Sequence, residues 1–142
     1  MSESPSDDAE IEDAISAFPQ SARARLLSLR AMIREVADAT PGVGPLTETL
    51  KWGQPAFLTP ATGSGTTLRL GADKKAPDEV KLYVPCQTDL IEQFRTHYAD
   101  ELSYSGKRAV IPGDMGPSEE AALRHCIALA LTYHARRKNR SR

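Results

Sequence analysis

The sequence predicts an α+β domain with two layers, in which an antiparallel sheet of about five strands packs on N-terminal and C-terminal helices. Three observations support this prediction. Apolar residues at helical spacing occupy both ends of the chain, alternating strand patterns occupy the middle, and short loops rich in Gly and Pro join the strands. Because short hairpin loops join antiparallel strands, we expect one sheet face to remain without helices.

The helices are predicted from apolar residues at three- and four-residue spacing. A short helix begins near Ile11 and ends before Pro19, because proline removes a backbone donor and clashes with the preceding turn. A longer helix follows Ser21, which is a suitable N-cap residue. An inserted helix follows Thr88, and a terminal helix starts near Ser118.

The strands are predicted from alternating polar and apolar residues between turn signals. Residues 46–51 leave two alternatives open, one helical turn or an irregular segment that leads into the first strand. The predicted strands are residues 55–59, 66–70, 79–84, 102–104 and 107–111.

The length and charge of the chain set its class. A chain of 142 residues fits one domain that can bury a core without a metal ion or disulfide. We expect a disordered acidic tail at residues 1–9, one domain at residues 10–136 and a basic tail at residues 137–142. The net charge of -1 and the absence of long apolar runs predict no nucleic-acid partner and no membrane.

The outward positions of the predicted strands and of the segment before them carry cations, aromatic rings and an amide. Trp52, the only tryptophan, stands in a Lys-Trp-Gly-Gln-Pro run that leads into the first strand. Arginine offers forked donors for carboxylate or phosphate, and indole offers apolar area with one donor. We therefore predict a non-catalytic module that holds a small anionic ligand or an acidic protein partner on the exposed sheet face, through Lys51, Trp52, Gln54, Arg69, Lys81, Tyr83 and Arg108. The alternative interpretation is that the strand residues are merely solvated and that Trp52 anchors the core.

Several segments together resemble a known family. They are Leu-Arg-x-x-Ile-Arg-Glu at residues 29–35, Glu-x-x-Lys-Trp-Gly-Gln-Pro-Ala-Phe at 48–57, Val-Lys-Leu-Tyr-Val at 80–84, Phe-Arg-x-x-Tyr at 94–98 and Tyr-His at 133–134. This pattern resembles the YdhG-like family of domains of unknown function. The resemblance implies a small α+β fold similar in outline to frataxin, and it brings no catalytic residues.

Some YdhG-like proteins have been linked to iron delivery, and this suggests an alternative function for the acidic N-terminal segment. Carboxylates suit hard cations such as iron, whereas ordinary solvation also explains a charged terminus. If iron is the cofactor, the resemblance implies a site made of Asp7, Asp8, Glu10, Glu12 and Asp13.

Two cysteines and three histidines complete the reactive side chains. The chain shows no secretory leader, and we expect a cytoplasmic protein with reduced thiols, although the sequence leaves open a disulfide between Cys86 and Cys126. Cys86 lies between a strand end and a helix start, where backbone N–H groups favour a thiolate, so a thiol-dependent enzyme is a third hypothesis beside an inert cysteine. The spacing of His97, His125 and His134 does not predict a metal site.

Overall fold

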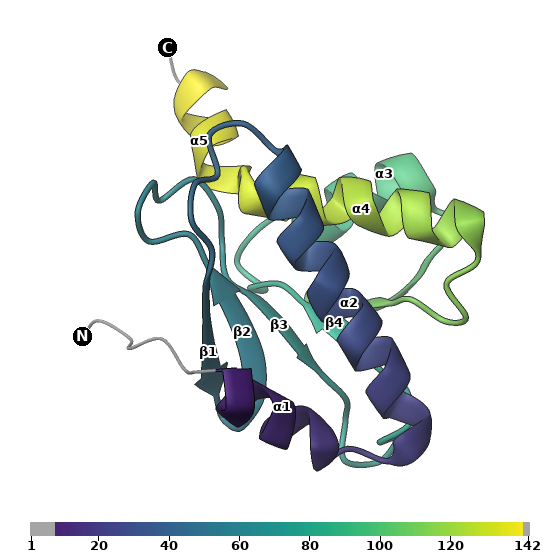
Figure 1. The fold of residues 1–142 in the computed structure, drawn as a ribbon. Coiled ribbons are helices and arrows are strands. Elements are labelled where there is room, and N and C mark those ends of the chain that lie inside the picture. The colour runs from purple at the N-terminus through teal and green to yellow at the C-terminus, as the bar shows by residue number, and fades with distance from the viewer. Residues whose placement is uncertain (1–7, 141–142) are drawn as a thin grey trace.

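The computed structural model describes residues 8–140, and the side chains of residues 8–138. It confirms the α+β class. Figure 1 shows α1, α2 and α4 on the same side of the sheet. The helices are α1 (Asp8–Ser16), α2 (Gln20–Ala39), α3 (Leu90–Tyr98), α4 (Pro117–Leu131) and α5 (Tyr133–Arg140). The strands are β1 (Thr47–Lys51), β2 (Gln54–Leu58), β3 (Leu68–Gly71), β4 (Lys81–Tyr83), β5 (Ser103–Ser105) and β6 (Ala109–Ile111).

The sheet has six antiparallel strands in the order β1-β2-β3-β4-β6-β5, where the sequence predicts about five. The additional strand is β1, which forms from the segment expected to be a helical turn or an irregular lead-in. Its second residue, Glu48, pairs with Phe57 and therefore faces the helices. A charged residue at an inward-facing position interrupts the alternation of polar and apolar residues from which strands are predicted.

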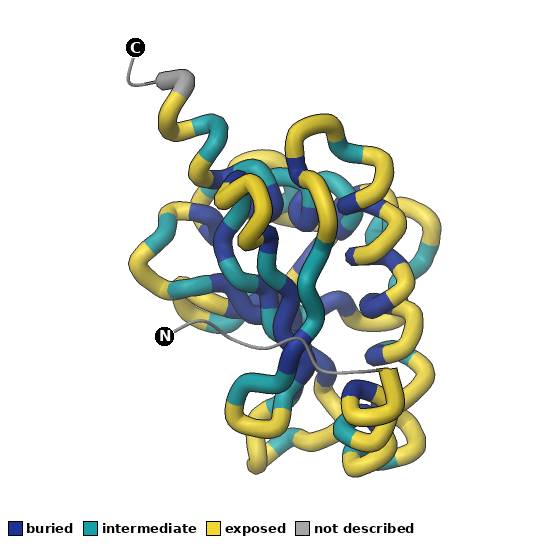
Figure 2. The backbone as a smooth tube through the Cα atoms, turned by 60° about the vertical axis from the view of Figure 1, so that its left-hand side comes forward, coloured by how far each residue is buried: buried dark blue, intermediate teal, exposed yellow. Residues whose placement is uncertain are grey.

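The core lies between the sheet and the helices. Leu70, Leu82 and Val110 form one cross-strand row through β3, β4 and β6, and all three side chains are fully buried. They belong to one cluster with apolar residues of the helices. Figure 2 shows buried positions along the strands and the inner sides of the helices, whereas the loops are largely exposed. The opposite sheet face therefore carries the residues that alternate with this row.

Both ends of the predicted domain differ from the structure. The first helix begins at Asp8 and not after residue 9, because the Asp8 carboxylate pairs with Arg30 and Arg34 of α2. At the other end, α5 continues through residue 140, into the segment predicted as a basic tail. Residues 1–7 of the predicted acidic tail lie outside the described part of the chain. Across residues 8–140, each helix is too short or too polar to cross a membrane.

Candidate functional site

Trp52 and Gly53 form a two-residue turn that closes the β1–β2 hairpin. Lys51 and Gln54 are the last paired residues, and φ is +51° at Trp52 and +74° at Gly53. Positive φ at both central residues is the arrangement of a type I′ turn, in which Asn-Gly is preferred. Glycine adopts this conformation easily, whereas a bulky aromatic residue does so rarely. Trp52 is 85% exposed, so it does not anchor the core.

The guanidinium group of Arg69 lies against two aromatic rings. Its Cζ atom is 5.2 Å from the centroid of the Trp52 ring and 4.9 Å from that of Tyr83, which pairs with Arg69 across β3 and β4. Both distances are within the range of cation–π attraction. Arg69 Nη1 also donates a hydrogen bond to Oε1 of Gln54. We call these four residues, Trp52, Gln54, Arg69 and Tyr83, the aromatic–arginine cluster.

A glycine on β3 makes room for Gln54. A Cβ atom built on Gly71 would lie 2.3 Å from Nε2 of Gln54 and 2.7 Å from its Cδ. The Gln54 side chain therefore lies across the backbone of Gly71 on its way to Arg69. Sequence reasoning missed the role of Gly71, because a strand glycine indicates close approach without indicating what approaches.

Lys81 is placed beside the cluster but is already neutralised. Its Nζ donates a 2.6 Å hydrogen bond to Oδ2 of Asp73, and the Tyr83 hydroxyl donates a 3.2 Å bond to Oδ1. The hydrogen bond from Lys81 lowers the pKa of Asp73, and the same bond raises the pKa of Lys81. Burial raises the pKa of Tyr83, so its hydroxyl stays protonated as a donor. Lys81 is 5% exposed and cannot serve as a main anion ligand.

Asp73 is a further residue that the sequence analysis missed. It stands two residues after the end of β3, in a charged segment that extends to residue 79. Strand alternation predicts which residues of β4 face outward, but it does not predict that a turn residue folds back onto them.

Two more cations of the predicted site lie near the cluster. Arg108 is exposed and forms no ion pair with the described residues. Burial lowers the pKa of Arg69, and the positive charge of Arg108 lowers it further, as expected when two cations lie near each other. Lys51 is half-buried next to the turn. Of the seven predicted residues, Trp52, Gln54, Arg69 and Tyr83 contact one another, and the role of the whole set in binding stays a prediction.

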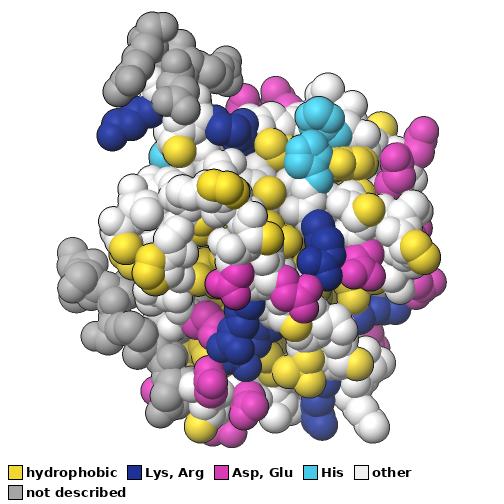
Figure 3. Space-filling model, turned by 45° about the horizontal axis from the view of Figure 1, so that its top comes forward, with side chains coloured by type: hydrophobic (Ala, Val, Ile, Leu, Met, Phe, Trp, Pro, Cys, Tyr) yellow, Lys and Arg dark blue, Asp and Glu magenta, His cyan; other side chains and the backbone are white. Residues whose placement is uncertain are grey.

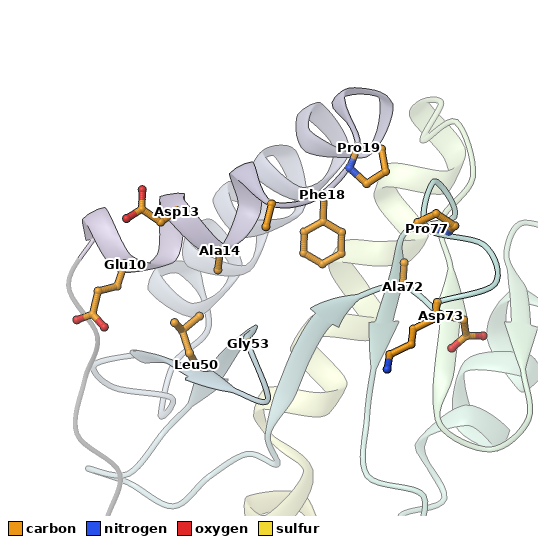
Figure 4. Close-up of a pocket in the computed structure, with 12 residues that line it drawn as sticks. Glu10, Asp13, Ala14, Phe18, Pro19, Leu50, Gly53, Ala72, Asp73 and Pro77 are labelled. Atoms are coloured by element: carbon orange, nitrogen blue, oxygen red, sulfur yellow. The ribbon is translucent and has the colours of Figure 1, made fainter.

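A groove of about 670 Å³ adjoins the same edge of the sheet. It separates α1 from the β1–β2 hairpin and from the turn after β3. Figure 4 shows Ala14 and Phe18 pointing toward Leu50 across the cavity, whereas the carboxylates of Asp13 and Asp73 point away from it. The interior of the groove is therefore mainly apolar.

The acidic residues of the iron hypothesis are divided among different surroundings. Asp8 is paired with Arg30 at 2.9 Å and with Arg34 at 3.1 Å, whereas Glu10 and Asp13 line the groove. The remaining residues of this set are Glu12, which is exposed, and Asp7, which lies outside the described residues. Among residues 8–138, no group of three or more His, Cys, Asp or Glu side chains is arranged to hold a metal ion.

The two cysteines lie in different surroundings. Cys86 is exposed, and α3 begins only at Leu90, so Cys86 does not lie at the helix N-terminus as the sequence suggests. Its Sγ contacts Oε1 of Gln87 at 3.9 Å. Cys126 is buried in α4, and burial raises its pKa to about 12. Both thiols are free, so the structure holds no bond between them.

Comparison with known proteins finds no matching family model, no matching curated sequence and no matching solved structure. The resemblance to the YdhG-like family therefore stays a prediction, based on the Trp-Gly-Gln-Pro-Ala-Phe segment and the weaker motifs around it.

Proposed function

We propose that this chain is a non-catalytic binding module that holds a small anionic ligand, or an acidic segment of a protein, at the aromatic–arginine cluster. One observation carries the proposal. The Arg69 guanidinium is held by two rings and an amide, and within residues 8–138 no carboxylate forms an ion pair with it. A restrained guanidinium whose charge is not neutralised is suited to a carboxylate or phosphate.

Restraint of the Arg69 side chain supports tight binding. Contact with the rings of Trp52 and Tyr83 restrains the guanidinium group, so less side-chain entropy is lost when an anion binds. Arg108 adds a second positive charge nearby. Asp73 repels an anionic ligand less strongly than a free carboxylate would, because Lys81 already neutralises its charge.

The conformation of Trp52 supports a binding role independently. An indole at positive φ and 85% exposed contributes little to the fold, and asparagine would form the turn more easily. Unfavourable backbone conformations persist most often at sites of function. The open side of the indole offers apolar area against which the body of an anion can pack.

The single tryptophan makes the proposal easy to test. We expect Trp52 emission to change when the protein is titrated with inorganic phosphate, citrate, benzoate or an acidic peptide. Replacing Arg69→Gln should weaken the effective ligand about tenfold or more, because a hydrogen-bonded charged pair contributes about 1.5–3 kcal/mol.

Arg95→Gln is the matched control. Arg95 stacks on Tyr104 at 5.1 Å, so the substitution removes the same kind of arginine–aromatic contact at another place. An equal loss of affinity in both variants, or no response of Trp52 to any of the four probes, would refute the proposal.

A further inference from the structure

Two histidines that are far apart in the sequence lie side by side at the surface. His97 of α3 and His125 of α4 have ring centroids 5.0 Å apart, with an angle of 61° between the ring planes. Figure 3 shows adjoining histidine side chains in cyan on this face. His97 is exposed and His125 is half-buried, so solvent reaches the pair. The spacing along the chain does not predict this arrangement.

A tyrosine fixes the orientation of the inner ring. The hydroxyl of Tyr98 is 2.6 Å from Nδ1 of His125, and the Tyr104 hydroxyl donates a 2.8 Å hydrogen bond to the backbone oxygen of Tyr98. Nε2 of His125 and both ring nitrogens of His97 make no hydrogen bond to a described residue. One nitrogen from each ring is therefore available to a ligand.

We propose that His97 and His125 bind one divalent transition-metal ion of the borderline class, such as Zn²⁺, Ni²⁺ or Cu²⁺, through one nitrogen from each ring. Zinc–imidazole bonds are about 2.0–2.1 Å long, which places the centroids of two rings on one tetrahedral ion about 5 Å apart. The observed separation of 5.0 Å agrees with this value. The second ring nitrogen of a metal-binding imidazole usually forms a hydrogen bond that orients the ring, and Nδ1 of His125 lies within hydrogen-bond distance of the Tyr98 hydroxyl.

The protein would supply only part of the coordination sphere of the metal ion. Because no group of three or more metal-binding side chains exists within residues 8–138, water must complete the coordination sphere. An open two-imidazole site favours metals in the Irving–Williams order, with Cu²⁺ bound more tightly than Ni²⁺ or Zn²⁺. The inference does not depend on the proposed anion site, which lies on the sheet.

Zinc titration of the full chain, followed by calorimetry and by NMR of the imidazole nitrogens, tests the proposal. We expect one equivalent of Zn²⁺ to shift the signals of His97 and His125. His97→Gln should lower the affinity at least tenfold, and this exposed position tolerates the change. Tyr98→Phe should lower it roughly tenfold, because outer hydrogen-bond partners typically contribute a factor of about 10–100.

His134→Gln is the matched control, since His134 is an exposed histidine on another helix, α5. The His134→Gln variant should bind Zn²⁺ with the same affinity as the wild type. If the wild type binds no Zn²⁺, Ni²⁺ or Cu²⁺, or if His97→Gln binds as tightly as the wild type, the two rings form only an aromatic contact and the proposal is wrong.

Discussion

At the scale of single residues, Trp52 is an unusual residue for its place in a tight turn. The first central residue of a type I′ turn must adopt positive φ, and Trp52 does so while its ring remains in solvent. The ring gains attraction to Arg69, which at an exposed site contributes about 0.5–1 kcal/mol. The left-handed conformation costs roughly 1–2 kcal/mol. Because these effects nearly cancel, Trp52 is not maintained by stability alone.

Replacement of Trp52→Asn should separate stability from binding. We expect the free energy of unfolding to change by less than about 1 kcal/mol, because relief of the backbone offsets the lost cation–π attraction. Anion affinity should fall, because the ligand loses the indole surface. Denaturant unfolding followed by circular dichroism measures the stability, and calorimetry measures the binding. An affinity equal to that of the wild type would contradict the role of Trp52.

At the scale of secondary-structure elements, one carboxylate joins α1, α2 and β1. Glu48 of β1 accepts hydrogen bonds from Arg30 at 2.9 and 3.1 Å and from Arg34, and Asp8 of α1 pairs with the same two arginines. The side chains of Arg30 and Glu48 are only 8% and 10% exposed. Burial opposes ionisation of Glu48, but the hydrogen bonds from Arg30 and Arg34 outweigh it and lower its pKa. The ionic group thus holds in place the strand that begins the site hairpin.

Glu48→Gln should therefore destabilise the protein at neutral pH, by about 3 kcal/mol, because breaking a buried pair leaves the arginine charge poorly compensated. A carboxylate with a lowered folded-state pKa stabilises the fold above its unfolded pKa, near 4.5, and this contribution is lost as the pH falls below that value.

Denaturant unfolding between neutral pH and about pH 3 checks both parts of this prediction. The wild type should lose more stability than Glu48→Gln over the acidic part of this range. Asp8→Asn is the control, because the exposed Asp8 should contribute less than about 1 kcal/mol. Parallel pH profiles for the wild type and Glu48→Gln would show that Glu48 does not cause the acid sensitivity.

At the scale of the whole molecule, one core supports both proposed sites. Leu82 of β4 is fully buried and belongs to the same cluster as Phe94 of α3 and Cys126 of α4. The residues on either side of Leu82 are Lys81 and Tyr83, which face the opposite surface of the sheet. Packing on the helix side therefore fixes the strand that carries part of the anion site.

Leu82→Ala should lower the free energy of unfolding by about 3 kcal/mol, within the usual range of about 2–5 kcal/mol for a buried leucine. Leu27→Ala is the matched control, because Leu27 is 48% exposed and should contribute less than about 0.5 kcal/mol. Circular dichroism during denaturant unfolding measures both variants. Equal effects at the two positions would mean that Leu82 does not lie in the core.

The sequence by itself determined the α+β class and the two faces of the central strands. Alternation along β4 places Leu82 on one face and Tyr83 on the other, and the structure places Arg69 beside Tyr83. These features are local, because a strand's period of two residues depends only on its own backbone geometry.

Only the tertiary structure decided the features that depend on distant partners. The strand β1 exists with Glu48 facing inward because arginines of α2 neutralise that carboxylate. Asp73 folds back onto Lys81, and α3 and α4 bring His97 to His125. Periodicity shows which side of an element a residue occupies, whereas the packing of whole elements decides which residues meet across the fold.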